Sequence, residues 1–472
     1  MFRRKHGLVV LTLLLVLSTL ASCGPTPTPE KVIVKETVTV KETVTVKETV
    51  TVKETVPVTV KETVVVPKDK TIVTIAYNQY FNMTFGPADP PIVAIKKAVE
   101  AKYPDIKVEL LVTSTEAKTW HDMYVTWFMA KDPTVDILGV GGYWTAEFAE
   151  AGWLEPLNDG VAPDVDPKIT AKLIPAYMEA HTYNGKLQGL GPWWGGIGGL
   201  YYRKDLLEKY GFQAPKTYDD IVTISKAIIA KEAGMTGWTW SGKKDVALVN
   251  RWFEYLYGFG GKYFHDNGKC AMNSPQALAA LEYMVKLIKD GISPAEVATW
   301  KEEDSMVRFV SGTSIFHTGR QDMLFWLDDP AKSKIVGKWG FIPNPAQPGG
   351  RPSGTYEGWA FAISKFSDSK DAALKVLEVM FDFPVQKELN LSQGPVQAHM
   401  DVYTDPVVIK NNPNMPLIEE IAKTALAPLS SPQYPEIADI LAEEIHSAIT
   451  GLKTPKAALT DACSRIDFAT GH

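Results

Sequence analysis

The residues in this chain that could do chemistry are mostly flat aromatic rings with polar side chains near them. The sequence contains 13 tryptophans, and an indole ring offers a wide apolar face together with one hydrogen-bond donor. Trp193 and Trp194 stand just before a glycine-rich stretch, Gly195 to Gly199, which is an unusual setting for core residues. Rings of this kind, beside amide and charged groups, are suited to stacking on a ligand and hydrogen-bonding its edges.

Patterns typical of catalysis or metal binding are weak. There is no CxxC, HExxH or clustered histidine pattern, no GxSxG elbow and no P-loop. Glu302, Glu303 and Asp304 are adjacent, and adjacent residues on a helix do not converge on one substrate bond. We therefore predict no catalytic residue, no metal and no cofactor. The net charge of −6, from 49 basic and 55 acidic side chains, also argues against a nucleic-acid partner.

Strands and helices alternate in the first part of the globular sequence. Thr71 to Tyr77 is β-branched and predicts a strand, Pro91 to Tyr103 predicts a helix, and strands are expected at Lys107 to Val112 and Val135 to Val140. This order predicts an α/β fold with a parallel sheet. Ligands gather where the strands of such sheets end.

Polar and aromatic residues follow these predicted strand ends. Tyr77, Asn78 and Gln79 close the first strand, and Tyr143 and Trp144 follow a later one. We expect them at a ligand site, with turn formation the alternative for the first group and core packing the alternative for Trp144.

The N-terminus has the features of a lipoprotein signal. Arg3, Arg4 and Lys5 precede an apolar run from Leu8 to Leu17, which is short for a membrane span. The run ends in Leu-Ala-Ser before Cys23, which resembles a lipobox, so residues 1–22 are expected to be removed and Cys23 to carry lipid. An ordinary signal with Cys23 incidental is the alternative. Removing three positive charges takes the net charge from −6 to −9, so acyl chains would hold the protein to the membrane.

A repeat follows the signal. KETVTV begins at Lys35, Lys41 and Lys47, with variants at Lys53 and Lys61. The period of six fits no coiled coil, and neither face of an extended chain could form a core. We interpret residues 23–70 as the lipidated cysteine and an extended tether that reaches ~150 Å at ~3.3 Å per residue. Strand pairing between molecules, as in an adhesin, is the alternative.

Two cysteines, Cys270 and Cys463, remain in the globular part. They could pair in an oxidising exterior, but the sequence does not give their distance. Our preferred interpretation is two separate buried thiols on helices.

Several segments, in this order, resemble the sugar-binding family of extracellular solute-binding proteins of ABC importers, which includes maltose and trehalose binders. The resemblance covers nearly all of residues 71–472. It is carried by DILGVGGYWTAEFAEAGWLEPL from Asp136, YNGKLQGLGPWW from Tyr183, LYYRKDLLEKYG from Leu200, FVSGTSIF from Phe309, EGWAFAISKFSDSKDAAL from Glu357 and YPEIADIL from Tyr434.

The resemblance implies a two-lobe fold like that of periplasmic binding proteins, with a hinge of several crossings and a ligand cleft between the lobes. Carried onto this chain, it implies a first lobe of 71–191 and 318–364 and a second lobe of 192–317 and 365–472. Crossings are expected near Gly191 to Trp194, His317 to Arg320 and Ser364 to Asp368. The implied function is a monomeric, lipid-anchored receptor outside the cell membrane that delivers a saccharide to an ABC permease.

By family position, Trp359 is the first candidate platform for a sugar ring, followed by Trp193, Trp194 and Trp240; core packing is the alternative for each. Arg320 offers five donors and Glu357 an acceptor for hydroxyl groups. An ion pair elsewhere, or a solvated charge at a strand end, is the competing interpretation.

The chain departs from the family pattern in two places. Many relatives have an Asp where this chain has Gly141, and an acidic residue where it has Gly195 and Gly196. Fewer carboxylates mean fewer strong acceptors, so the ligand could be a different or larger saccharide, or a solute that is not a sugar. A glycan-active enzyme is a further alternative.

Overall fold

A computed structural model describes residues 70–78, 81, 89–114, 117–158, 170–191, 195–393 and 397–472, which belong to one compact unit, Pro67–His472. The expected signal, Cys23 and the tether lie outside the described residues, as do Gln79, Trp193 and Trp194. Within the described part, no helix has the length and apolar character needed to cross a membrane.

The first sheet has the strand order β2-β1-β3-β12-β4. Its strands are β1 (Thr71–Asn78), β2 (Ile106–Thr113), β3 (Ile137–Gly141), β4 (Leu154–Glu155) and β12 (Trp359–Ser364). β1 pairs in parallel with β2 and β3, and β12 pairs antiparallel to β3. This mixed α/β arrangement confirms the predicted fold class.

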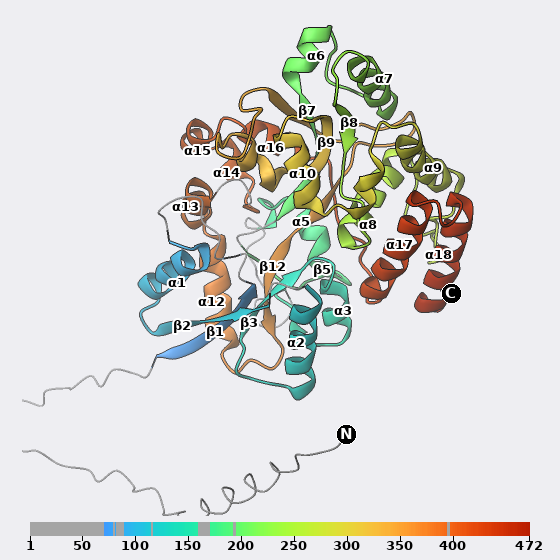
Figure 1. Ribbon diagram of the computed structural model, residues 1–472. Helices are drawn as coiled ribbons and strands as arrows, with labels where there is room; N and C mark the ends of the chain where they lie inside the picture. The colour runs from blue at the N-terminus through green and yellow to red at the C-terminus, as the bar shows by residue number, and fades with distance from the viewer. Residues whose placement is uncertain are drawn as a thin grey trace, which may run out of the picture. The chain divides into compact units, whose positions relative to one another are not determined.

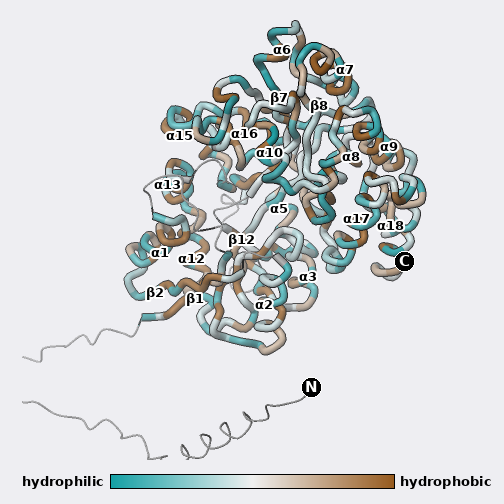
Figure 2. The backbone as a smooth tube through the Cα atoms, in the orientation of Figure 1, coloured by the Kyte–Doolittle hydropathy of each residue, from teal (hydrophilic) through white to brown (hydrophobic). Residues whose placement is uncertain are grey.

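Helices cover this sheet (Figure 1). α1 (Pro91–Lys102) and α12 (Lys370–Phe381) contact each other and the sheet, and α2 (Ala117–Ala130) and α3 (Thr145–Glu150) lie toward its other side in the view. β1 is buried along its second half, and Figure 2 shows its apolar character. Burial of these β-branched residues is the main force that fixes the sheet. We call this part the first lobe.

The second sheet has the order β13-β11-β7-β9-β8, with β10 also pairing with β7. Its strands are β7 (Gly196–Arg203), β8 (Thr236–Thr239), β9 (Ser314–Arg320), β10 (Trp339–Ile342), β11 (Gly354–Glu357) and β13 (Ala425–Leu426). β9 is antiparallel to β7 and parallel to β8. This sheet and its helices form the second lobe.

Four helices of the second lobe begin directly after a Ser, Thr or Asp cap. Thr217 forms a capping box with Asp220 at α7 (Tyr218–Ile229), and Asp245, Ser274 and Thr454 cap α8 (Val246–Gly258), α9 (Pro275–Lys289) and α18 (Pro455–Thr470). The helices are α6 (Lys204–Tyr210), α8 (Val246–Gly258), α9 (Pro275–Lys289), α10 (Glu302–Val310), α17 (Tyr434–Ile449) and α18 (Pro455–Thr470). The smaller elements are α5 (Pro175–Ala180), β5 (Thr182–Tyr183), β6 (Lys186–Leu187), η2 (Ala295–Thr299), η3 (Gln321–Met323), α11 (Leu324–Leu327), α13 (Phe383–Gln393), α14 (Asp401–Thr404), α15 (Pro406–Asn411) and α16 (Met415–Ala422).

The expected lobe boundaries were wrong in two places. β10 and β11, expected in the first lobe, pair with β7 of the second sheet, so the chain does not cross at His317 to Arg320. α12, expected in the second lobe, packs on β12, β1 and α1, so the chain does not cross at Ser364 to Asp368, where a crossing was expected. A buried strand pattern shows that a strand is covered on both faces, but it does not tell which sheet the strand joins.

The chain passes directly from a strand of one sheet to a strand of the other at two described places, and a third change of sheet lies between β12 and β13. One runs from Leu190, which bridges to Phe361 of β12, to the start of β7 at Gly196. The other is Gly358, between Glu357 of the second sheet and Trp359 of the first. Gly195 has φ +73, and a Cβ there would collide with the Glu357 carbonyl oxygen, so the two crossings touch.

Gln321 joins the crossings to the end of β9. Its side-chain Nε2 donates to the Gly195 carbonyl at 3.0 Å, and its Oε1 accepts from the backbone N of Ile197. Gln321 is fully buried. The side chain therefore fixes the first crossing to the residue that directly follows Arg320.

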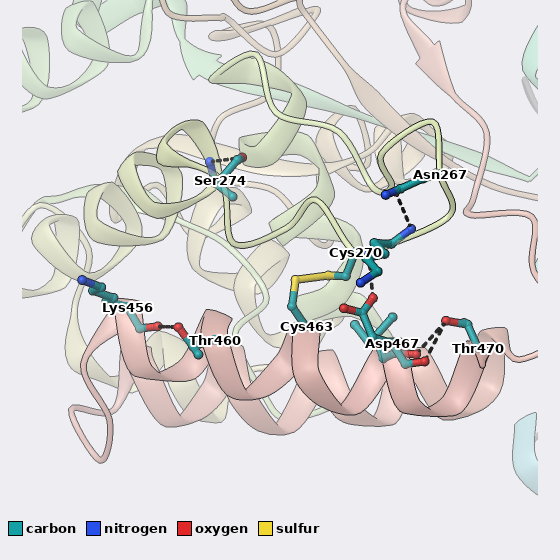
Figure 3. Close-up of a disulfide and its surroundings, with 11 residues drawn as sticks. Asn267, Cys270, Ser274, Lys456, Thr460, Cys463, Asp467 and Thr470 are labelled. Carbon is teal, nitrogen blue, oxygen red and sulfur yellow. Dashed lines mark hydrogen bonds between the residues drawn. A yellow bond between two sulfur atoms is a disulfide. The ribbon is translucent and has the colours of Figure 1, made fainter. Parts of the chain in front are cut away.

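A disulfide joins Cys270 and Cys463, with Cα atoms 5.3 Å apart (Figure 3). The preferred interpretation of two separate thiols was wrong, because packing of α9, α17 and α18 brings residues far apart in sequence together. Cys270 also lies outside the helices. Its backbone N donates to Asp467 Oδ1 on α18 at 2.7 Å, so the same contact is held by a hydrogen bond.

Candidate ligand-binding site

Several of the residues expected at a ligand site lie around Gly358, where the chain passes from one sheet to the other. Trp359, Tyr143 and Glu357 are partly exposed there, and Arg320 contacts Glu357. Glu357 ends β11, Trp359 begins β12, and Tyr143 follows β3. Residues contributed by both sheets therefore meet at one place.

Trp359 belongs to a cluster of rings in the first lobe. It stacks on Trp120 with centroids 4.4 Å apart and planes at 21°, and Tyr143 and Trp144 meet it edge-on at 5.4 Å and 5.3 Å. Trp120 and Trp144 are buried. Trp144 thus contributes mainly to the core that supports Trp359, in line with the alternative considered for it.

Gly141 makes room for two of these rings. β3 and β12 pair with Gly141 opposite Trp359, and a Cβ at Gly141 would lie 2.9 Å from the rings of both Trp359 and Tyr143. Spacings below 3.0 Å force a neighbour to move. The space that an Asp side chain would take at this position is therefore filled by aromatic rings.

Tyr434 completes the cluster from the second lobe, and the sequence analysis missed it. Its ring stacks on Tyr143 with centroids 5.9 Å apart and planes at 30°. Tyr434 is the first residue of α17 and is buried. No local signal in the sequence marks Tyr434, because an aromatic residue at the start of a helix is equally consistent with an exposed face.

A charged cluster lies beside the rings. Glu357 Oε2 is 3.3 Å from Arg320 Nη1, and Glu357 Oε1 is 3.2 Å from Arg251 Nη2. The side chains of Glu357 and Arg320 are 16% and 26% exposed, whereas Arg251 is fully buried. The structure therefore brings together the two charged residues expected at the site, and it adds Arg251 beneath them.

Glu254 and Glu302 also belong to the charged cluster, and sequence reasoning missed them. Glu254 Oε1 is 3.1 Å from Arg251 Nη2, and burial raises the pKa of Glu254 to about 7. Glu302 accepts hydrogen bonds from the backbone N of Arg320 at 3.2 Å and from Ser241 Oγ at 2.9 Å.

Opposing effects set the ionisation of the two other carboxylates. Burial acts to raise the pKa of Glu302, but Arg251 and Arg320 outweigh it, so the pKa is lowered. Burial also raises the pKa of Glu357, and the same two arginines oppose that rise. Partly buried carboxylates that are paired with arginines can accept hydrogen bonds from ligand hydroxyl groups with little competition from water.

The other expected residues lie apart from this place or contribute to its frame. Trp240 is fully buried and donates to Ser293 Oγ at 3.0 Å, in the core of the second lobe. Asn78 is buried at the end of β1 and donates to the Ser114 carbonyl at 2.9 Å, and Tyr77 is buried beside it. A buried ring with a satisfied donor has no free face, so Trp240 fits the alternative of core packing.

No group of three or more His, Cys, Asp or Glu residues that could hold a metal ion occurs among the described residues.

His317 lies within the second sheet, fully buried, and its Nδ1 is 3.2 Å from the Thr239 carbonyl. Burial lowers the pKa of His317 to about 4, so this imidazole is neutral at physiological pH. The arrangement as a whole offers ring stacking, one partly exposed carboxylate acceptor and one partly exposed guanidinium, and these groups are suited to holding a polar ligand.

Residues 88–387 match the family described as bacterial extracellular solute-binding protein. A probable ABC transporter-binding protein of Deinococcus radiodurans is 30% identical over 296 residues, which are 60% of this chain and 69% of that protein. A mannitol-binding protein of Pseudomonas aeruginosa is 23% identical, over 64% of this chain and 66% of its own length.

Solved structures are similar over most of the chain. A maltose-bound MalE3 of T. maritima is 32% identical with a TM-score of 0.71, and the match covers 84% of this chain and 99% of that one. A solute-binding protein of Thermotoga lettingae bound to α-D-tagatose is 26% identical with a TM-score of 0.69, covering 85% and 100% of the two chains.

Proposed function

The chain belongs to the family of bacterial extracellular solute-binding proteins, and on this premise we propose that it binds a saccharide or a related polyol between its two lobes and delivers it to an ABC permease. The observation that carries this proposal is the meeting of Trp359, Glu357 and Arg320 at Gly358. An indole face suits the C–H face of a sugar ring, and the charged pair suits its hydroxyl groups. The relatives named for maltose, tagatose and mannitol support the same ligand class.

The site favours binding over turnover. Hydrolysis of a glycosidic bond needs two carboxyl groups roughly 5 to 10 Å apart that both reach the substrate. Glu302 is 5% exposed and is held by Ser241 and the backbone of Arg320. Glu357 is paired with two arginines. We therefore propose that the ligand leaves the protein unchanged.

The remaining parts of the proposal concern the anchor and the assembly. Acylation of Cys23 would hold a monomeric receptor at the outer face of the cell membrane, close to the permease. Replacing Cys23 with Ala should move the protein from the membrane fraction to the soluble fraction. Retention of the variant in the membrane would refute the lipid anchor and leave the ligand proposal standing.

The deciding experiment is a thermal-shift titration of the full chain, purified in mild detergent, against maltose, maltotriose, tagatose, mannitol and ribitol. A true ligand at 100 times its dissociation constant should add about 2.7 kcal/mol to the free energy of unfolding. Stabilisation by amino acids or oligopeptides, with none by any sugar or polyol, would instead favour a non-sugar solute. Release of shortened products from an oligosaccharide would favour an enzyme.

A matched pair of variants tests the platform. Trp359→Ala should weaken binding at least tenfold, because stacked rings are lost from the ligand face. Trp339→Ala is the control: Trp339 is also partly buried, but it pairs with Arg203 at the far end of β7 from the site. Equal losses in the two variants would contradict the assignment of Trp359.

A further inference from the structure

The fully buried side chain of Arg251 lies directly beneath the partly exposed pair of Glu357 and Arg320. Its Nη2 atom forms ion pairs with Glu254 Oε1 at 3.1 Å and Glu357 Oε1 at 3.2 Å, and it donates a hydrogen bond to Thr355 Oγ1 at 3.4 Å. Its Nε and Nη1 have no hydrogen-bond partner among the described residues. A buried arginine that leaves donors unsatisfied is costly to the fold, so its stabilising effect alone does not account for it.

Hydrogen bonds between α8 and β11 fix the position of Arg251 relative to Glu357. Glu254 lies one helical turn after Arg251 on α8, and its Oε1 accepts from both the backbone N and the Oγ1 of Thr355, each at 3.0 Å. Thr355 is two residues before Glu357 on β11. Helix α8 is therefore fixed to the strand that carries Glu357, and the position of the guanidinium relative to the carboxylate is set on both sides.

We propose that Arg251 is a positioning residue for ligand recognition, which keeps the Glu357 carboxylate ionised and oriented beside Arg320 so that ligand hydroxyls meet a fixed acceptor and a fixed donor. This inference rests on the proposed function for its consequence in binding. Its structural part, the state of Glu357, can be measured without any ligand.

The surroundings of Glu357 explain why one arginine is not enough. Arg320 and Arg251 favour its ionised form, whereas burial and the charge of Glu302 oppose it. Glu254 is a second neighbouring carboxyl group. The titratable groups that face Glu357 from the packed elements are Arg251 and Glu254 of α8, Glu302 of α10, Arg320 of β9, Tyr143 after β3 and Tyr434 of α17. Removing Arg251 leaves a single cation among three carboxyl groups.

The first test follows Glu357 itself in the full chain, in detergent and without ligand. The ¹³C carboxyl signal of Glu357, identified by its loss in Glu357→Gln, is titrated with pH in the wild type and in Arg251→Met. We expect the midpoint to rise by at least one unit in Arg251→Met and to stay near the wild-type value in Arg251→Lys. An unchanged midpoint in Arg251→Met would overturn the proposal, whatever the ligand is.

The second test measures maltose affinity from pH 6 to pH 9 by calorimetry. Each unit by which the Glu357 midpoint rises above the working pH costs about tenfold in affinity. Arg251→Met should therefore bind weakly at neutral pH and recover at alkaline pH. A loss of affinity that is the same at every pH would indicate a merely structural role and refute the inference.

Two further variants control for folding. Loss of Arg251 alone leaves the Glu254 carboxyl group without its ion-pair partner. The double variant Arg251→Met/Glu254→Gln removes that group as well, so it should fold even if Arg251→Met does not. It should still show the shifted Glu357 midpoint. Arg203→Met removes another buried arginine, which pairs with Asp205 at 2.7 Å at the far end of β7. It should leave both the Glu357 midpoint and the pH profile unchanged. If the wild type binds no sugar, the proposed function fails and the midpoint still decides this inference.

Discussion

Breaking the Cys270–Cys463 disulfide should destabilise the second lobe strongly, because the bond closes a long loop. The two cysteines are 193 residues apart in sequence. The chain-entropy relation gives about 5 kcal/mol at 25 °C for a loop of this length, and measured values for native disulfides run from about 2 to 5 kcal/mol. We expect Cys270→Ala/Cys463→Ala to lower the free energy of unfolding within that range.

The assay is guanidinium unfolding followed by tryptophan fluorescence, with and without dithiothreitol. Reduction should lower the stability of the wild type by the same amount as the double substitution, and it should leave the double variant unchanged. This comparison distinguishes the effect of losing the disulfide from the effect of losing side-chain packing at the two buried cysteines. Hydrogen exchange should show α18 losing protection first, since one of the bonded cysteines lies on it. A change below about 1 kcal/mol would refute the reasoning.

Four further outcomes follow from the structure. Gly141→Ala should cost about 1 to 3 kcal/mol of stability and weaken sugar binding, because its Cβ displaces Trp359 or Tyr143; normal affinity in a calorimetric titration would contradict this. Trp240→Ala should cost about 3 to 5 kcal/mol in chemical unfolding yet leave ligand affinity intact, since the ring lies in the core. The pKa of Glu254 is raised from 4.5 to about 7, so its contribution to stability is complete below pH 4.5 and lost as the pH rises through 7, a fall of about 3 kcal/mol that Glu254→Gln should abolish. The pKa of His317 is lowered from 6.5 to about 4, so thermal melts of Glu254→Gln should show stability falling as the pH drops from 6.5 to 4. A pH profile of Glu254→Gln identical to that of the wild type would refute the Glu254 assignment, and constant stability of Glu254→Gln over pH 6.5 to 4 would refute the His317 assignment.

The sequence was most informative about elements whose residue types act locally. Caps such as Thr217 and Ser274 place helix starts because their side chains bond the first backbone N–H groups. The β-branched run at Thr71–Asn78 specifies a strand for equally local reasons. Membership of a sheet is different, since β10 and β11 join β7 through contacts that no local pattern encodes.

The same distinction applies to the site. Three residues of the site lie at the end or start of a strand: Arg320, Glu357 and Trp359. Their meeting could be expected, because the ligand crevice of an α/β fold lies where its strands end. Arg251 and Tyr434 lie on helices, where a charged or aromatic residue is equally consistent with an exposed face, and only packing turns them inward. Trp240 is fully buried, which fits the alternative of core packing, because tryptophan type alone does not separate a ligand platform from a core residue.

The described fold begins with β1 in the first lobe and ends with α18 in the second. Its two ends therefore report on different halves of the molecule, and the Cys270–Cys463 bond keeps the later end attached to its own half. A donor dye at Thr71 and an acceptor dye at His472 would test the expected hinge, because a ligand that rotates the lobes about Gly358 should change the energy transfer between the two dyes. Because its two ends lie in different lobes, the chain could report the proposed ligand binding by fluorescence without any rearrangement of its sequence.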